Sequence, residues 1–120
     1  MSRILIHTLA IISVAIIKGE GGMKEINLSY KKKNPEEVDL SYLLYLPDGY
    51  QQNKHDYPLV LFLHGAGERG TDLEKVKIHG IPKRVVDGAK FPFICIAPQC
   101  PKEGYWDRYE YVCSLISLIK

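Results

Sequence analysis

The residues of this chain whose types and spacing could do chemistry lie in one glycine-rich segment, from His64 to Gly70. Its glycines, at positions 65, 67 and 70, lack a Cβ, so the backbone can adopt left-handed dihedral angles and bring N–H groups close to a ligand. The apolar run before the segment, at residues 59–63, predicts a strand buried on both faces of a parallel sheet. Open α/β sheets bind ligands at the carboxyl ends of such strands, so the segment predicts a turn that binds an anion or an oxyanion.

A phosphate site is the less favoured form of this turn. The segment lacks the G-K-[ST] signature of a P-loop and the G-x-G-x-x-G signature of dinucleotide-binding proteins. The net charge of +2 comes from interspersed acidic and basic residues, so the composition gives no reason to expect a nucleic-acid partner. The chain has three cysteines and no C-x-x-C pair, and Cys95 and Cys113 fall in apolar patterns, which predicts buried free thiols.

A series of motifs around the glycine loop resembles one family. The sequence L-F-L-H-G-A-G at residues 61–67 resembles the His-Gly loop that follows the third strand of α/β-hydrolases. The flanking motifs are similar to those of the esterase and predicted-peptidase group, which includes phospholipase/carboxylesterase and dienelactone-hydrolase-like proteins. In chain order they are L-L-Y-L-P-D-G-Y at 43–50, G-A-G-E-R-G at 65–70, H-G-I-P at 79–82, F-P-F at 91–93 and A-P-Q-C-P at 97–101. The resemblance covers roughly residues 40–106, the N-terminal portion of such a domain.

This resemblance implies a role for each residue of the loop. The backbone N–H of Ala66 would donate to the negatively charged oxygen that develops during ester hydrolysis, as half of an oxyanion hole. Gly65 and Gly67 would let the loop curl around that oxygen. His64 would order the loop by hydrogen bonding to its own backbone rather than act as an acid or base. No cofactor and no metal ion is implied.

Four further residues are candidates for binding the substrate, a small-molecule ester. Glu68 and Arg69 could touch the substrate, or could pair with each other and brace the loop. Gln99 and Trp106 lie just past the carboxyl end of an expected strand and could line the pocket, although Trp106 could equally belong to the core. The role of His79 stays open, since this residue could line the mouth of the site.

The catalytic groups of a serine hydrolase are missing from the sequence. The sequence contains no G-x-S-x-G nucleophile elbow. Ser29 and Ser41 fall in strand patterns and Ser114 and Ser117 on the last helix, so none of them lies on a sharp strand-to-helix turn. A complete α/β-hydrolase needs about 200 residues, and this chain has 120. The favoured interpretation is therefore the N-terminal part of a serine hydrolase for carboxylic esters, inactive alone. The alternative is a small non-catalytic protein whose loop binds an anion or a partner.

The expected fold class is α/β. Residues 26–30 and 38–46 predict an antiparallel hairpin. A strand at 59–63, a helical crossover and a strand at 93–97 that stops at Pro98 predict a βαβ unit with both strands parallel. Short helices are predicted at 73–77 and 82–86. A final amphipathic helix is predicted, with an apolar face formed by Val112, Leu115, Ile116 and Ile119.

The family resemblance also implies a strand order that begins 1-2-4-3-5. Without a fifth strand, the strand at 59–63 would be an open edge with unpaired N–H and C=O groups. Its V-L-F-L sequence has no charge and no proline to block edge-to-edge pairing. The chain could therefore form oligomers through this edge.

Residues 1–22 are interpreted as a leader before a body of residues 23–120. The apolar run at 4–17 resembles the centre of a signal peptide, but it is too short to span a bilayer comfortably and no small-x-small cleavage site follows it. The purine-rich codons implied by K-G-E-G-G, directly before Met23, favour an upstream region that is translated and a true start at Met23. That start predicts a cytoplasmic protein, whereas a working signal would make the protein secreted or membrane-targeted.

Overall fold

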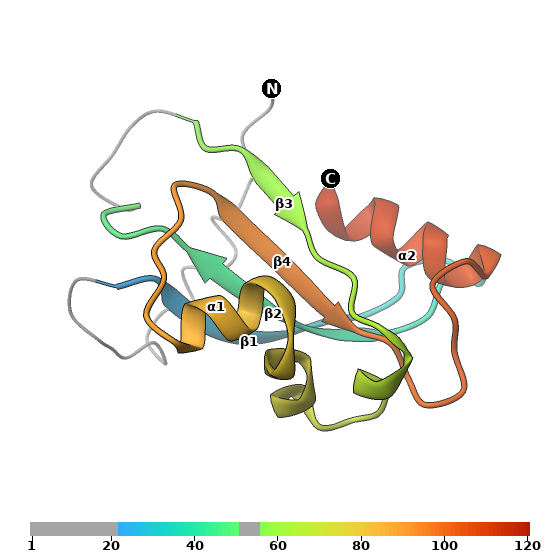
Figure 1. Ribbon diagram of the computed structural model, residues 1–120. Helices are drawn as coiled ribbons and strands as arrows, with labels where there is room; N and C mark the ends of the chain where they lie inside the picture. The colour runs from blue at the N-terminus through green and yellow to red at the C-terminus, as the bar shows by residue number, and fades with distance from the viewer. Residues whose placement is uncertain (1–21, 51–55) are drawn as a thin grey trace.

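The computed structural model describes residues 22–50 and 56–120, which form one mixed sheet with helices on both of its faces (Figure 1). The strands are β1 (Lys24–Tyr30), β2 (Leu40–Leu46), β3 (Leu59–Leu61) and β4 (Ile94–Gln99). The helices are the 3₁₀-helices η3 (Ala66–Glu68) and η4 (Leu73–Ile78) and the α-helices α1 (Gly80–Val86) and α2 (Tyr109–Ile119). The proposed leader lies outside the described residues, apart from Gly22.

The strand pairings confirm the α/β class and its two expected parts. The sheet has the order β1-β2-β4-β3, in which β1 and β2 form the antiparallel hairpin and β3 and β4 pair parallel. β2 and β4 pair antiparallel. Between β3 and β4 the chain passes through η3, η4 and α1. The helix expected at 73–77 is the 3₁₀-helix η4, capped by Asp72, and the helix expected at 82–86 is α1, which already begins at Gly80.

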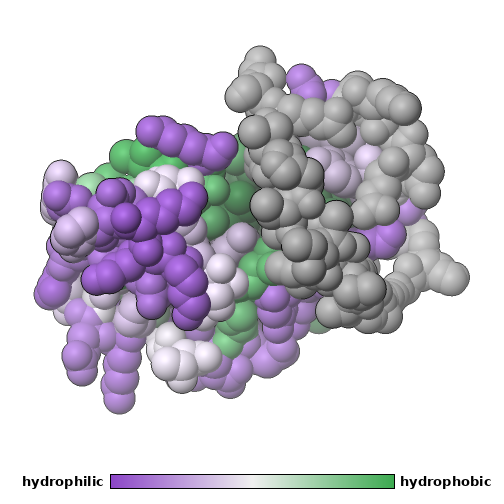
Figure 2. Space-filling view, turned by 180° about the vertical axis from the view of Figure 1, so that it is seen from behind, coloured by the Kyte–Doolittle hydropathy of each residue, from purple (hydrophilic) through white to green (hydrophobic). Residues whose placement is uncertain are grey.

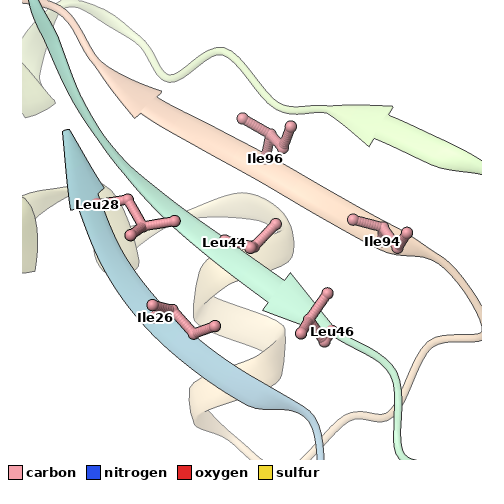
Figure 3. Close-up of a cluster of buried hydrophobic side chains, with 6 residues drawn as sticks. All are labelled: Ile26, Leu28, Leu44, Leu46, Ile94 and Ile96. Carbon is pink, nitrogen blue, oxygen red and sulfur yellow. The ribbon is translucent and has the colours of Figure 1, made fainter. Parts of the chain in front are cut away.

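Side chains alternate across a strand, so β2 and β4 supply two separate apolar faces. One face is a cluster of six aliphatic side chains (Figure 3): Ile26, Leu28, Leu44, Leu46, Ile94 and Ile96. Leu118 and Ile119 at the end of α2 pack on this cluster. The other face consists of Leu43, Tyr45, Cys95 and Ala97, against which Val76, Ile81 and Val85 of η4 and α1 pack. Helices on both faces hold the sheet, and with it the carboxyl ends of β3 and β4.

Pro98 does not end its strand, and that prediction was wrong. β4 continues to Gln99, and Pro98 lies opposite Tyr42 of β2. Alternate residues of β4 direct their backbone groups toward β3, as the bond from the Ile94 N–H to the Pro58 carbonyl shows (2.9 Å). The backbone groups of residue 98 face the same side, but β3 has already ended at Leu61. The N–H that proline lacks is therefore not needed by the ladder.

β3 is shorter and less buried than the sequence predicted. Its three residues, Leu59–Leu61, are all half-buried, and Leu63 is 40% exposed beyond the strand end. The reason is its position, since only β4 pairs with β3 among the described residues. The prediction of a strand buried on both faces was therefore wrong. The expected place of this strand at the edge of the sheet is confirmed for the part of the chain that the structure covers.

The buried face of α2 is rotated relative to the prediction. Leu115 is buried and Ile119 packs on the core, but Val112 and Ile116 are 38% and 47% exposed. The buried positions are instead Tyr111, Ser114 and Leu115. Ser114 is drawn inward because its hydroxyl donates to the carbonyl of Val38 (2.7 Å) and accepts from the Val38 N–H (2.8 Å). A polar side chain that satisfies the partly buried backbone groups of Val38 thus outweighed two aliphatic ones.

The surface contains apolar area as well as charge. Seen from behind, hydrophobic surface lies beside a hydrophilic region (Figure 2).

Cys95 and Cys100 are buried free thiols and Cys113 is half-buried, so the expectation of buried thiols holds for Cys95 and in part for Cys113. Burial raises the pKa of the Cys95 thiol to about 12. Within residues 22–50 and 56–120, no helix has the length and apolar character needed to cross a bilayer.

We expect the protein to self-associate through the edge of β3 that no described strand covers. The Phe62 N–H donates to Ile96 at 2.9 Å, so alternate backbone groups, at Leu59 and Leu61, point away from β4. No charged residue or proline lies in this strand to block pairing with a second copy. Sedimentation velocity over a concentration series should therefore show dimers or larger species.

A charge at the edge tests the source of this association. Leu63→Lys places a lysine next to the exposed edge and should shift the protein toward monomer, because charged side chains on an edge oppose strand addition. Val86→Lys is the matched control, since Val86 is also an exposed aliphatic residue (56%) but lies on α1. A wild-type protein that stays monomeric at high concentration contradicts the expectation, as does an equal response of the two variants.

Candidate functional site

His64, the first residue of the glycine loop, makes several of the contacts that hold the loop, and its side chain is buried. Its Nε2 accepts a hydrogen bond from the N–H of Cys100 at 2.9 Å. The ring proton therefore sits on Nδ1, which donates to the carbonyl of Gly65 at 2.5 Å. Both ring nitrogens are used by the backbone, one of them within the loop itself. This arrangement is the ordering contact that the sequence suggested for His64, and it leaves no ring nitrogen to move a substrate proton.

The loop is also held from within by a buried carboxylate. Glu68 Oε1 accepts from the N–H of Gly65 at 2.9 Å, across the short helix η3. The N–H of Glu68 in turn donates to the Gly65 carbonyl at 3.4 Å. Glu68 is buried, so its side chain braces the loop and does not face the pocket. No Glu68–Arg69 ion pair occurs among the described residues, and the brace that the sequence suggested for this pair consists of separate contacts.

The carboxyl end of β4 supports the loop from one side. Gln99 donates from Nε2 to the carbonyls of Glu68 and Asp72, at 2.9 and 2.8 Å. The N–H of Gly70 donates to the carbonyl of Cys100 at 3.0 Å, and Gly70 has a φ of 137°, which suits glycine. Gln99 is buried and lies outside the pocket lining. Its placement in the pocket was therefore wrong, because its amide satisfies backbone carbonyls of the loop.

The segment after β4 supports the loop from the other side. The indole N–H of Trp106 donates to the His64 carbonyl at 3.1 Å, and the two rings lie 5.2 Å apart. Arg69 donates from Nε to the Ala66 carbonyl at 3.0 Å and from Nη1 to the Gly104 carbonyl at 3.1 Å. Gly104 fits here because it lacks a Cβ, which would come within 2.5 Å of the Tyr111 side chain. The glycine loop and the segment around Trp106, about 40 residues apart in sequence, thus lie side by side and together form one wall of a pocket.

A small pocket of about 110 Å³ lies at this wall. It is lined by His64, Gly65, Ala66, Arg69, Cys100, Gly104, Tyr105 and Trp106. Of the residues that the sequence selected, five lie in this lining, and Gly67, Glu68 and Gln99 do not. Cys100, Gly104 and Tyr105 were not selected. Cys100 lies just past a strand end, and Gly104 and Tyr105 directly precede Trp106; these positions were the only local signals for them.

Two backbone donors between Gly65 and Gly70 remain free. Among residues 22–50 and 56–120, the N–H groups of Ala66 and Gly67 donate to no acceptor, whereas those of Gly65, Glu68, Arg69 and Gly70 do. These two are the first donors of η3, where a helix has no internal partners for its N–H groups. Ala66 is exposed and lines the pocket. A ligand oxygen in the pocket can therefore reach a donor that the protein itself leaves unused.

No nucleophile and base lie together at this pocket in the part of the chain that the structure describes. Serine does not occur in its lining, and Ser114 and Ser117 are hydrogen bonded to Val38 and Glu37 beneath α2. The one thiol there belongs to Cys100. Burial raises the pKa of this thiol, and the nearby charges of Arg69 and Arg108 only partly oppose that shift. A neutral buried thiol is a poor nucleophile.

His79 lies outside the pocket lining. Its Nε2 is 3.9 Å from Oε2 of Glu68, and its side chain is largely exposed. It therefore adjoins the brace of the loop rather than the pocket. The described residues contain no group of three histidine, cysteine, aspartate or glutamate side chains that could hold a metal ion.

Comparison of this chain with protein-family models, with curated proteins and with solved structures found no match.

Proposed function

We propose that this chain forms the N-terminal part of an α/β-hydrolase domain of the esterase type and supplies the oxyanion-hole loop of a serine hydrolase that acts on carboxylic esters. Two features support the proposal. The motifs from the hairpin to Trp106 occur in the order of that family. The strand order β1-β2-β4-β3 is the beginning of the order 1-2-4-3-5 that the resemblance implies.

The free N–H of Ala66 is the observation that carries the proposal. Among the described residues the Gly67 N–H is also free, but Gly67 lies outside the pocket lining, and the loop is held in place by contacts of His64, Glu68, Arg69, Cys100 and Trp106. In ester hydrolysis, attack of a nucleophile on the carbonyl carbon moves negative charge onto the carbonyl oxygen. A donor fixed in advance stabilises that charge without a reorganisation cost during the reaction. The serine nucleophile, the acid and the base would have to come from a continuation of the chain.

A binding role without catalysis is the second candidate. It is favoured by the absence of a nucleophile from the pocket lining and by the presence there of Arg69. In this case the loop N–H groups and the guanidinium would hold a small anion. The two candidates share the same pocket and differ in whether a serine is brought to it.

We expect purified protein of residues 1–120 to hydrolyse short-chain nitrophenyl esters no faster than the buffer does. A triad enzyme that lacks its nucleophile keeps only the part of the rate enhancement that oxyanion and substrate binding provide. The measurement is the initial rate with and without a serine-directed phosphonate. Turnover that the phosphonate abolishes would mean that one of the serines of this chain is a nucleophile, against the arrangement described above.

The DNA beyond the codon of Lys120 separates the two candidates. A G-x-S-x-G elbow in the same frame within about 30 residues, the length of one βαβ unit, would support the hydrolase. A chain that lacks such an elbow altogether would support the binding protein.

A further inference from the structure

Arg69 brings a positive charge to the pocket wall, and no carboxylate of residues 22–50 and 56–120 forms an ion pair with it. Its two hydrogen bonds go to the carbonyls of Ala66 and Gly104, which are uncharged. Among the described residues, neither Arg69 nor Arg108 lies within ion-pair distance of a carboxylate. A guanidinium has five N–H donors, so most of those of Arg69 remain for a ligand.

Tyr105 holds both guanidinium groups beside the pocket. The central guanidinium carbon lies 4.9 Å from the ring centroid for Arg69 and 5.1 Å for Arg108. Packing on an aromatic face limits the orientations of a guanidinium while its edge keeps its donors free. Tyr105 itself lines the pocket and is half exposed, so both charges lie where solvent and ligands reach. The remaining lining residues carry no negative charge, so the site favours an anion.

The positive charge and the free backbone donor belong to residues that line the same pocket. Arg69 Nε donates to the carbonyl of Ala66, the residue whose N–H is free, at 3.0 Å. Two acceptors of one small ligand could therefore meet the two groups at once. The pocket volume of about 110 Å³ restricts that ligand to a short molecule.

We propose that this pocket selects esters that carry a second, negatively charged carboxylate, which Arg69 binds while the ester carbonyl lies at the N–H of Ala66. This inference rests on the proposed function and names its substrate class: half-esters of short dicarboxylic acids. The guanidinium binds a carboxylate through two parallel N–H···O bonds, a geometry that a fully esterified compound cannot offer. Arg108 adds a second positive charge at the rim and strengthens the preference.

The test compares monomethyl succinate with dimethyl succinate, which differ by the charge of one group. Both are titrated into ¹⁵N-labelled protein of residues 1–120, and the shifts of the Ala66 and Gly67 amides and of the Arg69 Nε–H are followed. We expect the half-ester to shift all three signals, with a Kd at least about tenfold lower than that of the diester. The difference should shrink with added salt, because the attraction is electrostatic.

Variants identify which positive charge causes the preference for the half-ester. Arg69→Gln should abolish the preference for the half-ester, and Arg108→Gln, which breaks no hydrogen bond to the loop, should reduce it. Arg84→Gln is the matched control for net charge, since Arg84 lies on α1 and outside the pocket lining. Because Arg69→Gln could loosen the loop, Arg69→Lys serves as a second variant that keeps the charge and should keep part of the preference.

Three results would overturn the proposal. Equal binding of the two esters at Ala66 and Gly67 would remove the carboxylate preference and leave the proposed oxyanion role standing. Half-ester shifts confined to Arg69 and Arg108 would mean an anion site in which Ala66 has no part, and would remove the placement of the ester carbonyl at Ala66, whereas the oxyanion role itself is decided by the turnover of Ala66→Pro. Binding of neither ester to folded protein would exclude the pocket as a site for this substrate class.

Discussion

Ala66→Pro should lower kcat by about 100- to 1000-fold in a hydrolase that continues from these residues into a nucleophile elbow, the range found when one oxyanion-hole donor is removed. Proline has no backbone N–H, so the substitution deletes the free donor of the loop. KM should change less, because the donor acts mainly on charge that develops in the transition state. The measurement is kcat and KM for a short-chain ester, with circular dichroism to verify the fold.

Ala66→Gly is the matched control for this substitution. It changes the same side chain, by removing its methyl group, but keeps the N–H, and the Ala66 side chain is exposed, so kcat should stay within a few-fold of the wild-type value. In Ala66→Pro the carbonyl of residue 66 remains available to Arg69, so the brace at 3.0 Å is retained. A well-folded Ala66→Pro protein with near-normal turnover would exclude Ala66 from the oxyanion hole.

The loop could be located from the sequence because its signals are local. An apolar run that stops at His64 and three nearby glycines mark a strand end followed by a turn. The contact of the His64 ring with its own loop was expected for the same reason, because its partner, Gly65, is the next residue. What a short segment determines by itself could be predicted from that segment.

The supports of the loop could not be predicted in this way. Cys100 and Trp106 reach His64 across 36 and 42 residues of sequence. The pairing of β3 with β4, which the sequence did predict, brings these segments together, but the sequence does not show which side chains beyond the strand ends then meet. Gln99 was misplaced for the same reason: its position past a strand end suggested the pocket, whereas its amide donates to the carbonyl of Glu68 in the loop and to that of Asp72 just after it.

The errors in the fold have a similar origin. Periodicity grouped Val112 and Ile116 with Leu115 as one apolar face, but the hydrogen bonds of Ser114 to Val38 fix the rotation of α2. Pro98 ends a strand only where its missing N–H is needed, and here that side of β4 has no partner at this point. Both outcomes depend on what lies next to a residue in space.

Gly80→Ala should destabilise the fold by about 2–5 kcal/mol, from left-handed strain of about 1–2 and overpacking of about 1–3 kcal/mol. Gly80 has a φ of +66°, and a Cβ there would lie 2.3 Å from Cε1 of Phe62. Phe62 is half-buried and packs against the core cluster beneath η4 and α1, so its ring can move aside only by losing these contacts. For a domain near 100 residues, thermal unfolding should occur roughly 10 °C or more below the wild type.

Substitutions at two other glycines separate the effect of backbone strain from that of the steric overlap with Phe62. Gly88 has a φ of +102° with open space around it, so Gly88→Ala adds strain alone, and Gly67→Ala adds neither. Melting temperatures should therefore fall in the order Gly67→Ala, Gly88→Ala, Gly80→Ala, and Phe62→Leu should partly rescue Gly80→Ala in a double-mutant cycle. Equal effects at Gly80 and Gly88 would show that the Phe62 ring moves aside. The outcome bears on the site, because Phe62 lies two residues before His64 and its N–H is bonded to Ile96 (2.9 Å). A displaced Phe62 would therefore shift the strand end from which the glycine loop begins.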